Sequence, residues 1–139
     1  MAQPTLFLAD TIAWHRSAHP VVAAEWRRLL EDDRIATTEL VRLEVLYSAR
    51  GRADYQAVSA ELDGLHQLAA GTDDLRRALE IQRMLAQKPL HHRVAIRDLV
   101  IAAVAERHGA TVWHYDQDYE RIAAITGQLE VWVAARGTF

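Results

Sequence analysis

A long apolar segment in the last third of the chain reads Ile96-Arg97-Asp98-Leu99-Val100-Ile101-Ala102-Ala103-Val104-Ala105. Its side chains are apolar on nearly all sides of a helix, so we expect a buried central helix that opens at Asp98. Gly109 would end that helix in a left-handed conformation. Thr111-Val112-Trp113-His114 then has the pattern of a short strand, and Asp116-Gln117-Asp118 follows it. This segment predicts a helix and a strand whose ends carry carboxylates.

Short runs of strand-forming residues alternate with helical patterns along the rest of the chain. The other strand patterns lie at residues 5–9, 35–37, 66–68 and 129–133. Helical patterns fill the segments between them. Such alternation favours an α/β fold, with a central, mainly parallel sheet of four or five strands and helices on both faces.

Length and composition narrow the possible functions. With 139 residues, the chain is expected to form a single domain over residues 1–139. Its 16 Lys and Arg against 19 Asp and Glu give a net charge of -3, so any site for a polyanion must be local. The absence of Cys excludes disulfides, thiolate metal sites and a Cys nucleophile. Neither a signal pattern at Met1-Ala2-Gln3-Pro4 nor a membrane-length apolar window is present, so we expect a cytoplasmic protein without a membrane partner.

Three carboxylates stand at the ends of predicted elements. Asp10 follows the strand at 5–9, and Asp116 follows the strand at 111–114. The carboxyl ends of parallel strands meet at one edge of a sheet, where functional residues gather. Asp98, at the start of the central helix, would point to the same edge. We therefore expect these three side chains to converge.

A fourth carboxylate is predicted on an apolar helix face. Glu44 lies at helical spacing from Leu40, Val41 and Tyr47. A carboxylate that shares the face of core residues costs free energy unless it has a partner. Glu44 is therefore expected to join the converging carboxylates.

Converging carboxylates repel one another, and a cation relieves the repulsion. An all-oxygen set of donors, without Cys or a paired His motif, favours Mg²⁺ or Mn²⁺. One or two such ions can support phosphodiester hydrolysis. Simpler roles also stay open: Asp98 and Asp118 could each cap a helix, and Asp116 could be a turn residue.

Four segments together resemble the acidic motifs of a known family. They are Phe7-Leu8-Ala9-Asp10-Thr11, Leu43-Glu44-Val45-Leu46-Tyr47-Ser48-Ala49-Arg50, Ile96-Arg97-Asp98-Leu99-Val100-Ile101-Ala102-Ala103 and His114-Tyr115-Asp116-Gln117-Asp118-Tyr119-Glu120-Arg121-Ile122-Ala123. In this order and spacing they resemble the PIN domain, and most of all its VapC toxin branch, the ribonuclease half of bacterial toxin–antitoxin pairs. The resemblance covers essentially the whole chain and implies a compact α/β/α sandwich.

The resemblance also implies an Mg²⁺- or Mn²⁺-dependent endoribonuclease that hydrolyses RNA. Its catalytic residues would be Asp10, Glu44, Asp98 and Asp116, and its metal ligands Asp10, Asp98, Asp116 and Asp118. Thr11 would orient Asp10 or a water at the metal. The partners implied are a small cognate antitoxin, which inserts a basic side chain among the acids, and a second copy of the chain in a homodimer. Many PIN domains carry Ser or Thr just before the last Asp, where this chain has His114-Tyr115, so it departs from the family there.

Local positive charge is needed to hold RNA on a net-acidic protein. A basic turn and a basic loop supply it, and the residues expected to contact RNA phosphates are Arg50, Arg52, Lys88, Arg93 and Arg97. His91 and His92 are adjacent on the loop and lack the spacing of a zinc helix, which favours RNA contact or solvation over metal binding.

Two other functions compete with the ribonuclease. A degenerate PIN scaffold would bind RNA or a partner without cleavage, but it would lack an acid, and none is missing. A haloacid-dehalogenase-type phosphatase is suggested by Asp116-Gln117-Asp118, but that family carries its Asp pair after the first strand, and no Lys follows the pair in this chain.

Overall fold

The computed structural model describes residues 4–139, so most of the amino-terminal tetrapeptide considered above lies outside the described residues. The elements in chain order are β1 (Phe7–Ala9), α1 (Thr11–His15), α2 (Pro20–Glu31), β2 (Ile35–Thr37), α3 (Glu39–Tyr47), α4 (Arg52–Asp63), β3 (His66–Gln67), α5 (Thr72–Ala86), α6 (Ile96–His108), β4 (Thr111–His114), α7 (Gln117–Thr126) and β5 (Glu130–Trp132). None of the described helices combines the length and the apolar character that crossing a bilayer requires.

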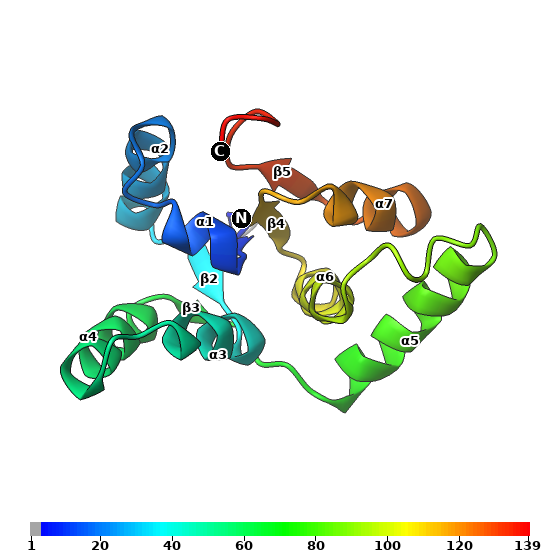
Figure 1. Cartoon of the computed structure of the whole chain (residues 1–139), viewed down its shortest axis with the longest axis horizontal. Helices are drawn as coiled ribbons and strands as arrows, with labels where there is room; N and C mark the ends of the chain where they lie inside the picture. The colour runs from blue at the N-terminus through cyan, green and yellow to red at the C-terminus, as the bar shows by residue number, and fades with distance from the viewer. Residues whose placement is uncertain (1–3) are drawn as a thin grey trace.

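The five described strands form one sheet in the order β3-β2-β1-β4-β5, and every neighbouring pair is parallel. Helices α1 and α2 lie on one side of this sheet and α5, α6 and α7 on the other, while α3 and α4 lie near the β3 edge (Figure 1). The predicted α/β/α sandwich with a mainly parallel sheet is therefore confirmed.

Helix α6 is the buried central helix that its composition predicts. Its buried residues include Leu99 and the run from Ile101 to Ala105. It packs between α5 and β4. Full burial of each Leu or Ile contributes roughly 1.5–3 kcal/mol, so this helix carries a large share of the core energy. Gly109 ends it with φ 67°, in the left-handed region, as expected.

The opposite face of the sheet is covered by an aromatic stack. The ring of Trp26 on α2 stacks on Trp113 of β4 at 5.5 Å between centroids, and Trp14 on α1 meets Trp26 edge-on at 5.8 Å. Trp113 is 3% exposed. The stack fixes α1 against the sheet, and α1 begins directly after Asp10.

The prediction that one apolar face of α3 is buried is wrong in part. Val41 and Val45 are its buried residues, whereas Leu43 is 67% exposed and Tyr47 92% exposed. A short helix near the edge of a sheet is covered along only one narrow stripe, so apolar side chains outside that stripe reach solvent. Glu44 therefore lies at the border of the core and is only partly buried.

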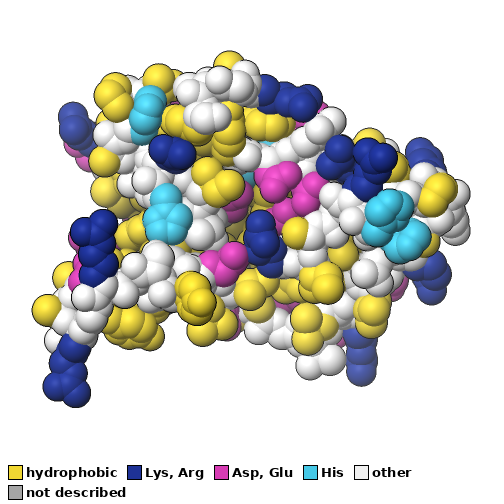
Figure 2. All heavy atoms as spheres, viewed as in Figure 1, with side chains coloured by type: hydrophobic (Ala, Val, Ile, Leu, Met, Phe, Trp, Pro, Cys, Tyr) yellow, Lys and Arg dark blue, Asp and Glu magenta, His cyan; other side chains and the backbone are white. Residues whose placement is uncertain are grey.

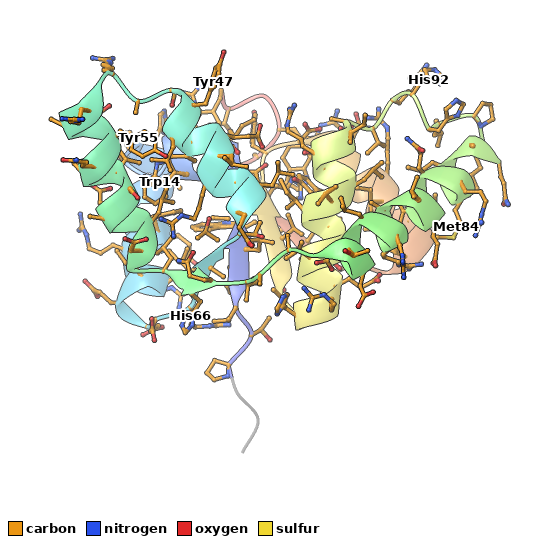
Figure 3. The ribbon with its side chains drawn as sticks, turned by 90° about the horizontal axis from the view of Figure 1, so that it is seen from below. Trp14, Tyr47, Tyr55, His66, Met84 and His92 are labelled. Carbon is orange, nitrogen blue, oxygen red and sulfur yellow. The ribbon has the colours of Figure 1, made fainter. Side chains whose placement is uncertain are left out.

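Figure 3 shows which end of the molecule carries the predicted RNA-binding segments. Tyr47 at the end of α3 and His92 beyond α5 lie on the same side of the molecule, the side at which β1 ends. The basic turn follows Tyr47 in sequence, and the basic loop surrounds His92. Both segments are thus at the carboxyl-terminal edge of the sheet.

Candidate active site and metal centre

A small cavity of about 100 Å³ opens at the carboxyl-terminal edge of the sheet. Figure 2 shows acidic side chains gathered around a hollow near the middle of this face, with basic side chains beside them. The cavity is lined by Asp10, Thr11, Ile12, Glu44, Arg97, Asp98, Ile101, Asp116 and Tyr119. The four carboxylates of the predicted catalytic set thus surround one space.

Asp10 and Asp116 reach the cavity because β1 and β4 are parallel neighbours. Each also begins the next helix as its N-cap. The Asp10 carboxylate accepts the backbone N–H of Ala13 at 2.9 Å, and the Asp116 carboxylate accepts that of Asp118 at 2.9 Å. Asp10 takes the cap position of α1 because the helix begins immediately after the strand. These bonds hold both carboxylates in fixed orientations.

Asp98 is not a helix cap. Helix α6 begins at Ile96, two residues earlier than expected, and its N-cap is Ala95. The Asp98 Oδ1 instead accepts a hydrogen bond from the hydroxyl of Tyr119 at 3.0 Å. Its Oδ2 is buried and has no hydrogen-bond partner among the described residues. A buried carboxylate oxygen without a donor is costly, which makes it a natural ligand for a cation.

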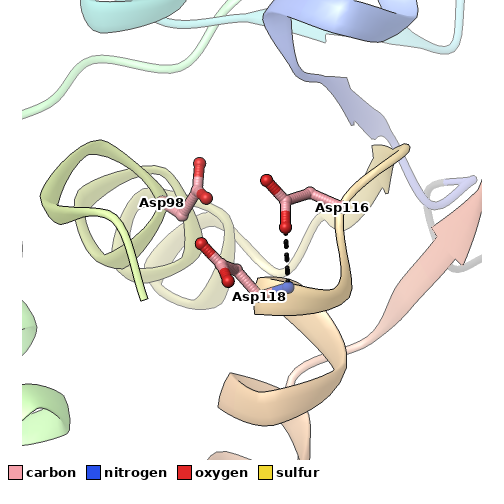
Figure 4. Close-up of side chains that lie close together, drawn as sticks. All are labelled: Asp98, Asp116 and Asp118. Atoms are coloured by element: carbon pink, nitrogen blue, oxygen red, sulfur yellow. Dashed lines mark hydrogen bonds between the residues drawn. The ribbon is translucent and has the colours of Figure 1, made fainter. Parts of the chain in front are cut away.

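Asp98, Asp116 and Asp118 form the tightest acidic group in the described part of the chain, with one oxygen of each within 4.8 Å of the others (Figure 4). Asp118 is not the cap of α7 either, since Asp116 is. The Asp118 carboxylate accepts the backbone N–H of Ala95 at 3.0 Å and a guanidinium N–H of Arg121 at 3.1 Å. Asp10 and Glu44 line the same cavity but are not members of this tight trio.

Two of these carboxyl groups resist ionisation. Burial raises the pKa of Asp98 to about 8, aided by the neighbouring carboxyl group of Asp118 and by the charge of Asp116. Burial also raises the pKa of Asp10 to about 7, and the charges of Asp116 and Glu44 act in the same direction against the bond from Ala13. The cost of charging these groups falls if a cation binds among them. An all-oxygen donor set with a buried, unpartnered oxygen fits Mg²⁺ or Mn²⁺.

Glu44 completes the rim of the cavity. Its side chain is 29% exposed, and its Oε1 accepts the hydroxyl of Thr11 at 3.2 Å. Arg97 lies 3.4 Å from Glu44 Oε2 and 3.8 Å from Asp98 Oδ1. The hydroxyl of Thr11 thus bonds Glu44 and not Asp10, and its expected contact with a water at the metal stays a prediction. Arg97 is the cation that the described residues place inside the acidic cavity.

The other predicted RNA-binding residues are exposed and lie outside the cavity lining. They are Arg50, Arg52, Lys88 and Arg93. Their segments lie at the same end of the molecule as the acids (Figure 3). Contact with RNA remains a prediction for each of them.

Sequence reasoning missed Tyr119. Its ring is 1% exposed, and its hydroxyl holds Asp98. The position three residues after Asp116, on the first turn of α7, was the available signal, because one turn of helix returns a side chain to the face of the cap. Reasoning from the sequence also treated His114 only as a departure from the family pattern, although it is fully buried beside the site, where burial lowers its pKa.

Comparison with known proteins places this geometry in context. The PIN domain family model matches residues 8–125. Ribonuclease VapC18 of Mycobacterium tuberculosis is 51% identical over 135 residues, which cover 96% of this chain and 98% of that protein. Ribonuclease VapC21 of the same organism is 43% identical with the same coverage.

Among solved structures, VapBC2 from Rickettsia felis, bound to a DNA fragment from its promoter, contains a chain that superposes with a TM-score of 0.75. The match covers 92% of this chain and 98% of that chain, at 19% identity. At that identity the similarity demonstrates the shared fold alone.

Proposed function

This chain belongs to the PIN domain family, in its VapC ribonuclease branch, and we propose that it is the RNA-cleaving toxin of a toxin–antitoxin pair that uses Mg²⁺ or Mn²⁺. The observation that carries the metal dependence is the buried Asp98 Oδ2, which lacks a hydrogen-bond donor among the described residues and lies in a trio with Asp116 and Asp118. The reaction is hydrolysis of a phosphodiester bond within RNA.

We assign the metal ligands to Asp98 and Asp116, with Asp10 in the lining of the same cavity and Asp118 beside the other two, outside that lining. When bound, a divalent cation supplies positive charge that neutralises the acids and polarises both the phosphate and the attacking water. Tyr119 keeps Asp98 oriented by donating a hydrogen bond from its hydroxyl to Oδ1. The hydrogen bonds at the two helix starts do the same for Asp10 and Asp116.

Glu44 is the proposed proton acceptor. Its partial exposure at the rim allows water and substrate to reach it, and Thr11 holds one of its oxygens. Arg97 balances its charge in the free protein and can turn to an RNA phosphate when substrate binds, since half of its side chain is exposed. The more distant basic residues then hold the flanking phosphates.

The proposed partners are RNA and a cognate antitoxin, and the chain is proposed to act in the cytoplasm as a homodimer. A toxin–antitoxin complex from Klebsiella pneumoniae and VapBC-5 from Mycobacterium tuberculosis, a member of the VapBC family of toxin–antitoxin systems, contain chains with this fold, which supports a partner of that kind. An antitoxin side chain that reaches the acids must be basic, and a guanidinium fork matches a carboxylate cluster. Arg97 already sits against two of these carboxylates, so the cavity mouth accepts such a group.

The competing functions lose support at the site. A degenerate scaffold would lack part of the acidic set, yet all four acids line one cavity. The phosphatase would need its Asp pair after the first strand, but Asp116 and Asp118 follow β4.

Cleavage of RNA by the purified chain tests the proposal. The toxin is freed from its co-expressed antitoxin, refolded and incubated with cellular RNA in Mg²⁺, Mn²⁺ or excess EDTA, and RNA ends are mapped by sequencing. We expect new ends only with the cation. Asp98→Asn should give none, whereas Asp73→Asn, an exposed acid in the first turn of α5, should cleave normally. Undiminished cleavage in EDTA would exclude the metal mechanism, and the absence of new ends under all conditions would exclude a ribonuclease.

A further inference from the structure

His114 is a fully buried imidazole at the end of β4, directly before the last acidic motif. Its ring packs against Tyr119 at 4.7 Å between centroids and against Trp132 at 5.1 Å. Both ring nitrogens of a buried imidazole need hydrogen-bond partners, because water cannot supply them. The nature of those partners sets which nitrogen carries the proton.

Both nitrogens of His114 have partners. Nδ1 accepts the backbone N–H of Asp116 at 3.1 Å, and Nε2 lies 2.8 Å from Oε1 of Glu130 on β5. A backbone N–H can be donated only to an unprotonated nitrogen, and a carboxylate oxygen can only accept. The two contacts are satisfied together when the proton is on Nε2 and Nδ1 is bare. Glu130 therefore selects the tautomer that accepts the Asp116 N–H.

The same ring contacts two residues that position members of the acidic trio. Its Nδ1 holds the turn that presents the Asp116 carboxylate, and its face supports Tyr119, whose hydroxyl holds Asp98. A change in the ring's tautomer would break the bond to the Asp116 N–H, and the turn would keep only its bonds to α7, the N-cap bond from the Asp118 N–H and the bond from the Tyr119 N–H to the Asp116 carbonyl oxygen at 3.3 Å. The bond between Glu130 and His114 thus reaches the site through Asp116.

We infer that His114, held in one tautomer by Glu130, is a positioning residue that fixes the Asp116 carboxylate for cation binding. The inference rests on the proposed function, since it concerns the cation site assigned there. Partners that orient metal ligands in this way typically change metal affinity by about 10-fold or more when removed. A purely structural pair would affect folding stability and leave the cation affinity of the folded protein unchanged.

The test substitutes Glu130, because replacement of the fully buried His114 would disturb the core, whereas the Glu130 side chain is 22% exposed. Glu130→Gln keeps an acceptor oxygen at the same reach, and Glu130→Ala removes it. His66→Ala is the matched control, since His66 also pairs with a carboxylate, that of Asp33 at 3.2 Å, but lies on β3 at the far edge of the sheet. Binding of Mn²⁺ to each full-length protein is measured by the electron paramagnetic resonance of the free ion, well below each melting temperature. The ¹⁵N resonances of the His114 ring report its tautomer at a single neutral pH.

We expect Glu130→Ala to bind Mn²⁺ about tenfold more weakly than wild type. Glu130→Gln and His66→Ala should stay within about twofold of wild type, and the wild-type ring should carry its proton on Nε2. The inference would be overturned if Glu130→Ala bound Mn²⁺ as tightly as wild type, or if Glu130→Gln or His66→Ala weakened binding as much as Glu130→Ala. It would also be overturned if the wild-type ring carried its proton on Nδ1. Each of these outcomes would leave the proposed function intact. A wild-type protein that binds no Mn²⁺ would overturn both, so the two failures are distinguishable.

Discussion

Replacement of Asp98 by Asn removes one ionisable carboxyl group from the acidic trio with almost no change in volume. Asn can still accept the Tyr119 hydroxyl, which now reaches Asp98 Oδ1 at 3.0 Å. Its amide N–H groups can donate toward Asp118, where the wild-type Oδ2 has no hydrogen-bond donor among the described residues. In the absence of a cation, the substitution should therefore stabilise the fold.

The magnitude follows from the pKa of Asp98, which burial raises from 3.8 to about 8. The pKa of Asp98 is higher in the folded protein than in the unfolded chain. Its carboxyl group therefore contributes fully to the free energy of unfolding below about pH 3.8, and this contribution is lost as the pH rises toward 8. At pH 7 the unfolded state has released a proton that the folded state keeps. At about 1.36 kcal/mol per pH unit over the roughly three units between 3.8 and 7, the loss has a ceiling of about 4 kcal/mol. The uncharged Asn side chain of the variant avoids this loss, and the 4% exposure of the Asp98 side chain leaves little solvent screening.

Urea unfolding followed by circular dichroism measures the effect. In EDTA, Asp98→Asn should exceed wild type by about 2–4 kcal/mol at pH 7 and match it within about 1 kcal/mol at pH 4. Added Mn²⁺ at about 100 times its dissociation constant should stabilise wild type by about 2.7 kcal/mol and the variant far less. RNA cleavage by the variant should be abolished at low Mn²⁺. Equal pH dependence of the two proteins in EDTA, or wild-type cleavage by folded Asp98→Asn, would refute the assignment of Asp98.

Three other substitutions probe the rest of the site. Asp10→Asn should also abolish cleavage. Because the pKa of Asp10 is raised to about 7, urea unfolding should show that the substitution stabilises the cation-free protein at pH 7 and not at pH 4. A variant that is destabilised at both pH values would contradict this. Tyr119→Phe removes the donor to Asp98, which should cost about 1–3 kcal/mol at pH 7 in EDTA and weaken Mn²⁺ binding by calorimetry; unchanged affinity would show that the hydroxyl does not orient the ligand. Charge reversal of both Lys88 and Arg93 should weaken the binding of single-stranded RNA. It should also reduce the slope of log affinity against log salt concentration by about 0.7 for each phosphate that the variant no longer neutralises. Equal slopes for variant and wild type would show that the RNA does not contact these two residues.

The fold and the four acidic positions could be predicted from local patterns. The apolar run of α6 has no polar face to expose, so it had to be buried, and strands that alternate with helices had to form a parallel sheet. Asp10 and Asp116 follow directly from that sheet, because side chains at the carboxyl ends of neighbouring parallel strands meet at one edge. Asp98 at the start of the central helix and Glu44 on an apolar helix face were expected at the same edge, and the resemblance to the PIN domain, since confirmed, implied the same four residues.

The detailed contacts depend on distances between segments far apart in the chain. Asp10 caps α1 because the helix begins without a linker after β1, and the Thr11 hydroxyl donates to Glu44, 33 residues away. Apolar residues of α3 are exposed because the helix lies near the edge of the sheet. The sequence pattern within the helix does not predict that position.

The pairing of His114 with Glu130 illustrates the same limit most clearly. In sequence, His114 is a departure from a motif and Glu130 is one of 19 acids. Their contact exists because β4 and β5 are parallel neighbours, with His114 opposite Trp132 in the ladder, and because burial leaves the ring no water to bond. Local patterns predict which residue types lie at the ends of elements, whereas hydrogen-bond partners and pKa values depend on the packing of distant segments into a shared, water-poor space.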